Sequence, residues 1–94
     1  MTFEEFKKSL REDQPPSSMN ANLKALWEDA RGNWDKAHEI AQNTSGVNGD
    51  WIHAYLHRKE GDLGNAAYWY HKAGKAMPKE NLDSEWEHLV RTML

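Results

Sequence analysis

Apolar residues recur through this chain at the three- and four-residue spacing that places them on one face of an α-helix. The series that show it are Phe3, Phe6, Leu10; Leu23, Leu26, Trp27, Ala30; Trp34, Ala37, Ile40, Ala41; Leu63, Ala66, Ala67, Tyr70, Ala73; and Trp86, Leu89, Val90, Met93. No window alternates apolar and polar residues over the length of a strand. The pattern therefore predicts an all-α fold.

The sequence pattern of the N-terminal part predicts an arm that is separate from the rest of the chain. Thr2 and Glu5 have the spacing of a capping box, and the apolar stripe that follows predicts a short helix over residues 3–12. The sequence DQPPSSMN then contains two Pro and two Ser, which is typical of a linker. We therefore expect an N-terminal helix and linker in residues 1–20 and a helical repeat domain in residues 21–94.

Glycines and capping residues predict where the central helices end and begin. Gly32 and Gly61 suit the left-handed conformation that ends a helix, and Asn33 and Asp62 follow them as N-caps. The sequence NTSGVNG is a loop by composition, so Asp50 is expected to cap the next helix. Two helix hairpins result, one on each side of this loop.

The end of the chain predicts one more helix. Pro78 closes the preceding hairpin, and Ser84 with Glu87 has the spacing of a second capping box. The apolar face of the terminal helix needs a partner, and we expect this helix to cover the open end of the stacked hairpins.

The two hairpins repeat one another at a constant offset of 29 residues. Residues 23–44 can be laid on residues 52–73, which pairs Ala25 with Ala54, Gly32 with Gly61 and Ala37 with Ala66. A repeated helix hairpin cannot bury its apolar face alone, so it packs on its neighbour and leaves a curved surface. The offset therefore favours two stacked hairpins that act as a binding module.

The second hairpin resembles a tetratricopeptide repeat. The residues that carry the resemblance are Ala54, Gly61, Leu63, Ala66, Tyr70, Ala73 and Pro78, within a stretch that includes AAYWYHKAGKAMP. It covers about residues 48–78 and weakens over residues 19–44, where Ala41 replaces the expected aromatic and the step is 29 residues rather than the family's ~34. The segment WIHAYLHRKEGD is also similar to small uncharacterised bacterial proteins, which implies a bacterial source.

The tetratricopeptide resemblance implies peptide or protein binding on the concave face. The groove positions that it implies are Trp51, Tyr55, Arg58 and Lys59, with Asn22, Leu26 and Asp29 from the weaker repeat. Independently, Trp51, Tyr55 and Arg58 are spaced i, i+4 and i+7, so they share one helical face, and such residues are frequent binding anchors. The alternative is that both aromatics belong to the core under a terminal helix, with Arg58 extended over them.

Histidines form the second candidate site. His53 and His57 are spaced i, i+4 and Glu60 follows, so the three side chains can point to one side of a helix as metal ligands do. A further ligand is needed, and His38 or His71 is available to supply it. Histidines that are hydrogen-bonded between helices explain the same residues without an ion. On that interpretation we expect neither a metal nor another cofactor.

Composition and charge exclude several classes of function for this protein. The chain has 94 residues, 12 basic against 15 acidic residues, a formal charge of -3 and no Cys. This balance argues against nonspecific binding to nucleic acid or anionic lipid, and the lack of Cys excludes disulfides, thiol catalysis and Cys-based zinc sites. No apolar run has the length of a signal-peptide core or a membrane helix, so we expect a cytoplasmic protein without a membrane partner.

Sequence motifs of catalysis are missing. There is no GxGxxG or Walker A loop, no GxSxG elbow, and no Ser, His and acid at a recognisable spacing. We therefore expect a small module for protein or peptide interaction that is not an enzyme and that is able to form a homo-oligomer. The alternative is a metal-dependent enzyme or metal-binding protein that uses His53, His57 and Glu60.

Overall fold

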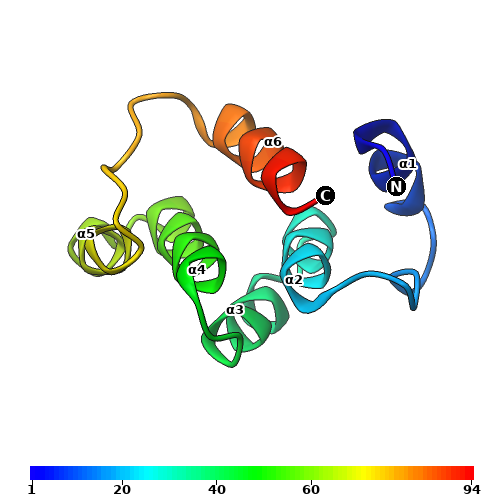
Figure 1. Cartoon of the computed structure of the whole chain (residues 1–94), viewed down its shortest axis with the longest axis horizontal. Helices are drawn as coiled ribbons and strands as arrows, with labels where there is room; N and C mark the ends of the chain where they lie inside the picture. Colours follow the sequence, from blue (N-terminus) through cyan, green and yellow to red (C-terminus); the bar gives the residue numbers. More distant parts are fainter.

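The computed structural model describes all 94 residues and contains six helices and no strand. The helices are α1 (Phe3–Ser9), α2 (Ala21–Ala30), α3 (Trp34–Gln42), α4 (Val47–Glu60), α5 (Leu63–Lys72) and α6 (Leu82–Met93). None of them has both the length and the apolar character that crossing a membrane requires. The prediction of an all-α fold built from helix hairpins is confirmed (Figure 1).

The two predicted hairpins are α2 with α3 and α4 with α5, and they pack on each other through α3 and α4 (Figure 1). Ala37 and Ala66 occupy equivalent places in the two hairpins, and both are fully buried. Gly32 and Gly61 follow the first helix of each pair with φ of 84° and 91°, in the region that favours glycine. The small residues thus let paired helices approach closely, and the glycines turn the chain between them.

Helix α6 lies across the first helices of both hairpins, α2 and α4, rather than over the end of the stack (Figure 1). Its apolar stripe is buried there, with Leu89 and Val90 fully excluded from solvent. The expectation that this helix would cover the open end was therefore wrong. Helices α2 and α4 carry most of the buried apolar residues, among them Leu26, Trp27 and Leu56, and α6 packs on these two helices.

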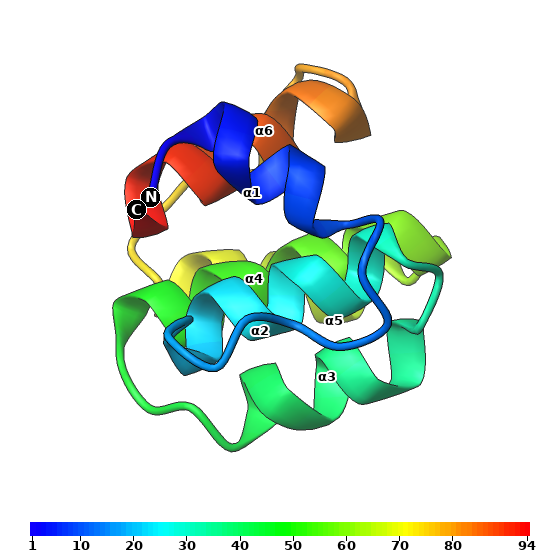
Figure 2. The same cartoon turned by 90° about the vertical axis from the view of Figure 1, so that its right-hand side faces the viewer.

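Helix α1 packs beside α6 through two aromatic residues (Figure 2). Phe3 and Phe6 are buried, and their rings lie 6.0 and 5.8 Å from the ring of Trp86. The capping box of Thr2 and Glu5 is present, but the helix ends at Ser9 instead of reaching residue 12. The linker then runs back along α2 to its N-terminus, which fixes the arm on the body of the protein (Figure 2).

Two helices begin earlier than their sequences suggested. Helix α4 starts at Val47 behind Gly46, so Asp50 lies in its first turn and is not the cap. Helix α6 starts at Leu82, and its cap is Asn81, whose side chain accepts a hydrogen bond from the Ser84 amide. The start of α4 was misplaced because polar and small residues in its first turn resemble a loop by composition. The start of α6 was misplaced because Ser84 and Glu87 have the spacing of a capping box although they lie inside the helix.

One predicted cap has a different partner. Asn33 precedes α3, yet its side chain makes no capping bond. Its Nδ2 instead donates a hydrogen bond of 2.9 Å to the Glu28 carboxylate. The Asn33 amide thus acts as a donor to a buried carboxylate, which forms a stronger, charge-assisted hydrogen bond, and not as the acceptor of an N-cap.

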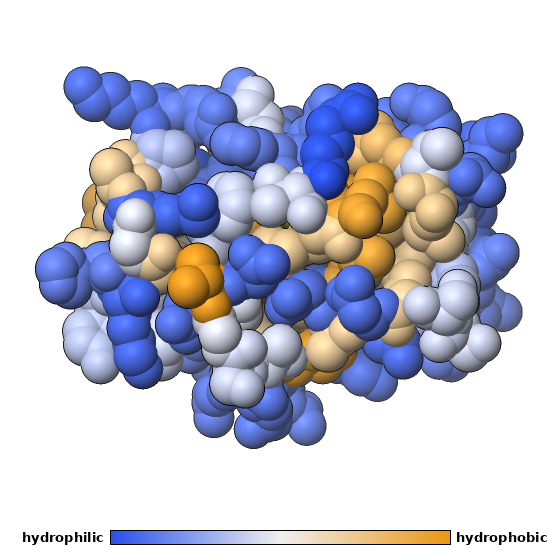
Figure 3. All heavy atoms as spheres, viewed as in Figure 1, coloured by the Kyte–Doolittle hydropathy of each residue, from blue (hydrophilic) through white to orange (hydrophobic).

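Most of the surface in Figure 3 is polar, and apolar side chains gather on its right-hand side, where α6 ends beside the start of α2. A small cavity of about 280 Å³ lies between the two chain ends there. Its apolar lining consists of Met1, Met19, Leu23, Met93 and Leu94.

Candidate functional site

Three histidines from two helices converge between the hairpins. His38 comes from α3, and His53 and His57 come from successive turns of α4. One nitrogen from each ring can be chosen so that all three nitrogens lie within 4.8 Å of one another. The ring of His38 lies 4.5 Å from that of His53 and 5.0 Å from that of His57, so packing of α3 on α4 brings the three together.

Two tryptophans flank the histidine cluster, which we define as His38, His53 and His57. The Trp34 ring stacks on His38 at a centroid distance of 5.0 Å, and the Trp69 ring stacks on His53 at 4.0 Å. His53 and His57 are buried, and His38 is half-buried at the solvent side of the cluster. The rings are therefore held in place by aromatic contacts while one edge of the cluster stays open to water.

Burial keeps two of these imidazoles in their neutral form. It lowers the pKa of His53 to about 4, and the neighbouring His38 and His57 act in the same direction. Burial also lowers the pKa of His38, with His57 as the next cause. Neutral imidazole is the form of histidine that binds a metal ion, so the two groups are ready to ligate near neutral pH.

Glu60 fixes the orientation of the third imidazole. Its Oε2 lies 2.6 Å from Nδ1 of His57, one turn earlier on the same helix. Because this bond uses Nδ1, Nε2 is the nitrogen of His57 that remains for a ligand. A carboxylate on the far nitrogen of a ligating histidine is the usual partner that sets its tautomer and its ring orientation.

The cluster offers three nitrogen ligands and no more. At metal–nitrogen distances of about 2.0–2.1 Å, tetrahedral ligands lie about 3.4 Å apart, so small side-chain rotations would close this set around an ion. Three protein ligands leave the fourth position of a tetrahedral ion for water or another small ligand. Asp62 also comes within 4.8 Å of His57 and Glu60, which adds a second carboxylate beside the cluster.

The structure changes the ligand set that the sequence indicated. His53 and His57 do meet, but Glu60 bonds to His57 from outside the cluster and is not its third member. Of the two further candidates, His38 completes the cluster, whereas His71 is exposed on α5. Spacing alone did not choose between them, because the choice depends on which helix packs against α4.

The expected ligand groove is covered by α6. Trp51 and Tyr55 are 5% and 2% exposed. Trp51 Nε1 donates to the Glu85 carboxylate at 3.1 Å, and the Tyr55 hydroxyl donates to Asp29 at 3.3 Å. Trp51 and Tyr55 therefore lie in the core, as the alternative interpretation held. Where an open groove was expected, the structure has a small cavity whose lining includes Asp29, Tyr55 and Lys59.

The two basic groove residues are paired with buried carboxylates. Arg58 binds Glu85 at 2.7 Å and also donates to the carbonyl of Glu80. Lys59 binds Asp29 at 3.0 Å. Sequence reasoning missed the burial of Glu85, because this residue lies between the two residues of the predicted capping box.

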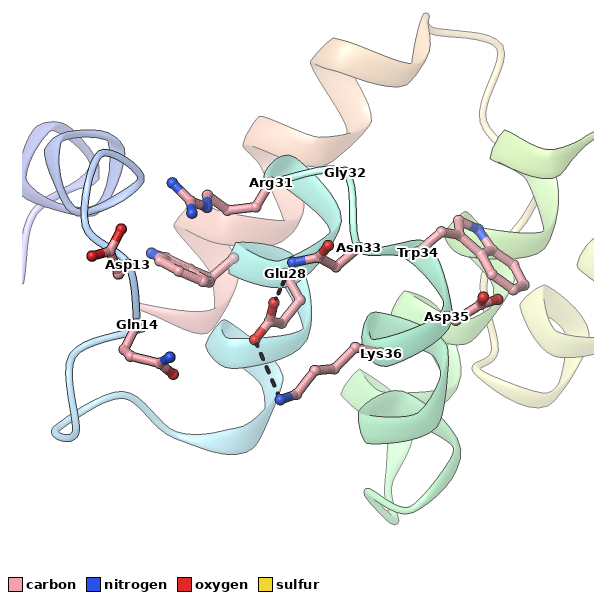
Figure 4. Close-up of a pocket in the computed structure, with 10 residues that line it drawn as sticks. Asp13, Gln14, Glu28, Arg31, Gly32, Asn33, Trp34, Asp35 and Lys36 are labelled. Carbon is pink, nitrogen blue, oxygen red and sulfur yellow. Dashed lines mark hydrogen bonds and ion pairs between the residues drawn. The ribbon is translucent and has the colours of Figure 1, made fainter.

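A polar cavity of about 580 Å³ lies at the turn between α2 and α3 (Figure 4). Glu28 points into it and is bonded to Asn33, with the Lys36 ammonium 4.0 Å away. The charged groups around it carry both signs and offset one another. This cavity therefore presents no chemistry as specific as that of the histidine cluster.

Comparisons with known proteins found no relative of this chain. No protein-family model matches the chain, and neither the curated proteins nor the solved structures give a match.

Proposed function

We propose that this protein binds a divalent transition-metal ion through His38, His53 and His57. The observation that carries the proposal is the convergence of three imidazoles from two helices, with ligating nitrogens within 4.8 Å. The lowered pKa values of His38 and His53 support it, because no proton has to be displaced near neutral pH. Glu60 supports it further by leaving Nε2 of His57 free.

The chemistry of the ligands indicates which ions fit. Imidazole nitrogen suits zinc, copper, nickel and iron, whereas calcium and magnesium prefer oxygen ligands. With no Cys in the chain, thiolate ligation does not compete. The proposed function is metal binding, and the fourth position of the ion is left for water or a small ligand.

Histidines that pack between helices without an ion are the competing explanation, and a titration separates the two. Chelator-treated protein is titrated with Zn²⁺ by calorimetry and with Ni²⁺ by tryptophan fluorescence, which is sensitive because Trp34 and Trp69 stack on the cluster. We expect one ion per chain. His38→Ala is expected to lose binding, and Glu60→Gln to weaken it by about 10- to 100-fold.

The matched control is His71→Ala, which removes an exposed histidine outside the cluster. It should bind metal as the unmodified protein does. If His38→Ala and His71→Ala bind equally well, or if neither ion binds with one-to-one stoichiometry, the cluster is a packing feature and the proposal fails.

We also propose that the protein makes a protein contact through the outer face of α5. This helix packs mainly on α4, at the left end of the molecule in Figure 1, and it reaches α6 through the hydrogen bond from Tyr70 to Glu85. Leu63 and Tyr68 are 56% and 58% exposed there, with the small residues Gly64 and Ala67 between them. Large exposed apolar side chains at the open end of a helical stack favour association with another protein.

The test of this contact uses substitutions that leave the core intact. Tagged protein is compared with the Leu63→Ser and Tyr68→Ser variants in affinity capture from an extract of the source cells, followed by mass spectrometry. We expect a protein that the unmodified chain retains and both variants lose. A Val47→Ser variant, which changes an exposed apolar residue on α4, is the control. Equal recovery with all four proteins would refute the contact.

A further inference from the structure

A second cavity lies under the N-terminal helix, away from the histidine cluster. It has a volume of about 310 Å³, within the range of small-ligand sites, which begins near 300 Å³. Helices α1, α2, α4 and α6 all contribute to it. Its lining residues are Lys7, Leu10, Asp29, Ala30, Tyr55, Lys59, Asp83 and Trp86.

The fixed charge in this cavity is negative. The Asp29 side chain is 1% exposed and is held by two bonds, from the Tyr55 hydroxyl at 3.3 Å and from the Lys59 ammonium at 3.0 Å. A carboxylate buried to this degree needs a cation, because an unpaired charge away from water is very costly. Lys59 meets that need, but its own side chain is 40% exposed and sits on a long flexible stem.

The walls of the cavity suit an aliphatic chain that carries a positive charge. Trp86, Leu10 and Ala30 give it an apolar side, and Trp86 is held in place by its contacts with Phe3 and Phe6. Aromatic side chains also attract ammonium groups. Asp83 supplies a second, exposed carboxylate at the same cavity.

An anion fits this cavity less well, although two lysines line it. Lys59 is already paired with Asp29, and the Lys7 ammonium lies over the Phe3 ring at 5.6 Å. A bound anion would stand beside the buried Asp29 carboxylate, which cannot turn away. A cation instead replaces Lys59, whose ammonium can move out to water at little cost.

We propose that this cavity binds a small aliphatic amine, whose ammonium group takes the place of Lys59 on Asp29. A diamine is favoured over a monoamine, because Asp83 offers a partner for the second ammonium. In the free protein Lys59 acts as an internal competitor for the site. The proposal is independent of metal binding, since none of the three histidines lines this cavity.

The internal competitor gives the proposal a sharp test. Chelator-treated protein is titrated with the diamine cadaverine, and amide shifts are followed by two-dimensional NMR. The same titration is made with Lys59→Met, Asp83→Asn and the control Lys79→Met, which changes an exposed lysine outside the cavity. Pentanol, a neutral molecule with a chain of the same length, tests the need for charge.

We expect shifts at residues that line the cavity, and binding about tenfold tighter in Lys59→Met because the competing ammonium is gone. Asp83→Asn should bind more weakly, while Lys79→Met should match the unmodified protein and pentanol should cause no shifts. Lys59→Met should also melt at a lower temperature and regain stability when cadaverine is added.

Two results would overturn the proposal. One is the absence of cavity shifts in both the unmodified protein and Lys59→Met. The other is equal affinity of the unmodified protein and Lys59→Met for the diamine. If Lys59→Met does not fold even with cadaverine, then Asp83→Asn decides: unchanged affinity in that variant refutes binding at this cavity, and weakened affinity supports it.

Discussion

Arg58 of α4 forms an ion pair with Glu85 of α6, with 2.7 Å between Nη1 and Oε1. The same carboxylate accepts hydrogen bonds from Trp51 at 3.1 Å and from Tyr70 at 2.6 and 2.8 Å. Glu85 is only 1% exposed, so one buried carboxylate joins α4, α5 and α6. Burial and this carboxylate also raise the pKa of the Tyr70 hydroxyl, which stays protonated and donates.

Loss of the Arg58 partner should destabilise the fold. Arg58→Met leaves the Glu85 carboxylate buried without its cation, and we expect the free energy of unfolding to fall by about 3–5 kcal/mol. The control is Arg91→Met, because Arg91 forms an exposed pair with Glu87 at 2.8 Å. That change should cost about 0–1 kcal/mol. Urea unfolding curves measure both, and similar small losses would show that the Glu85 network does not hold α6 in place.

The close packing of α5 on α4 should tolerate no larger residue at Ala66. This side chain is fully buried, so Ala66→Leu has to push the helices apart and should cost about 1–3 kcal/mol. The neighbouring Ala67 is exposed, and Ala67→Leu should be nearly neutral. Thermal melts of the two variants check the repeat packing, which would be contradicted by equal melting temperatures.

Gly49 should be required by the turn that leads into α4. A Cβ at this position would overlap the Thr44 carbonyl oxygen, which belongs to the backbone and cannot rotate away. We therefore expect Gly49→Ala to destabilise the protein by about 1–3 kcal/mol. Gly64 is also helical and has open space where its Cβ would lie, so Gly64→Ala should gain up to ~1 kcal/mol. Denaturant titrations should therefore show a lower free energy of unfolding for Gly49→Ala and a higher one for Gly64→Ala.

Acid should destabilise the protein through His53. Its pKa is lowered to about 4 in the fold, against an ordinary value of 6.5, so the unfolded chain takes up the proton first. The free energy of unfolding is then highest above pH 6.5 and falls as the pH drops towards 4. Unfolding curves in chelator between about pH 7 and pH 5 measure this slope before most carboxylates are protonated.

Two histidine variants check the origin of that slope. His53→Gln should reduce the loss of stability on acidification, since its side chain takes up no proton in this range. His71→Gln, on the exposed face of α5, should leave the slope as it is. The assignment to His53 is wrong if both variants keep the full slope.

Local sequence patterns determined the helices and the paired hairpins. The spacing of apolar residues depends only on the period of a helix, and Gly32 and Gly61 suit the left-handed backbone that ends one. Ala37 and Ala66 were predicted on the apolar faces of equivalent helices, and both are fully buried. These features are readable because each depends on residues within a few positions of one another.

Only the tertiary structure decided which helix covers which face. The spacing of Trp51, Tyr55 and Arg58 showed that they share a side of α4, but an open groove and a buried interface have the same spacing. The placement of α6 made that side an interface, and it brought Glu85 to Trp51 from 34 residues away in the sequence.

The histidine cluster was likewise predictable from the sequence only in part. That His53 and His57 lie on one face of α4 follows from the helix period alone. The meeting with His38 depends on how α3 packs against α4, and His71 was an equal candidate until that packing was known. Helix periodicity thus specifies which side chains share a surface, whereas long-range packing of helices selects the partner that faces it.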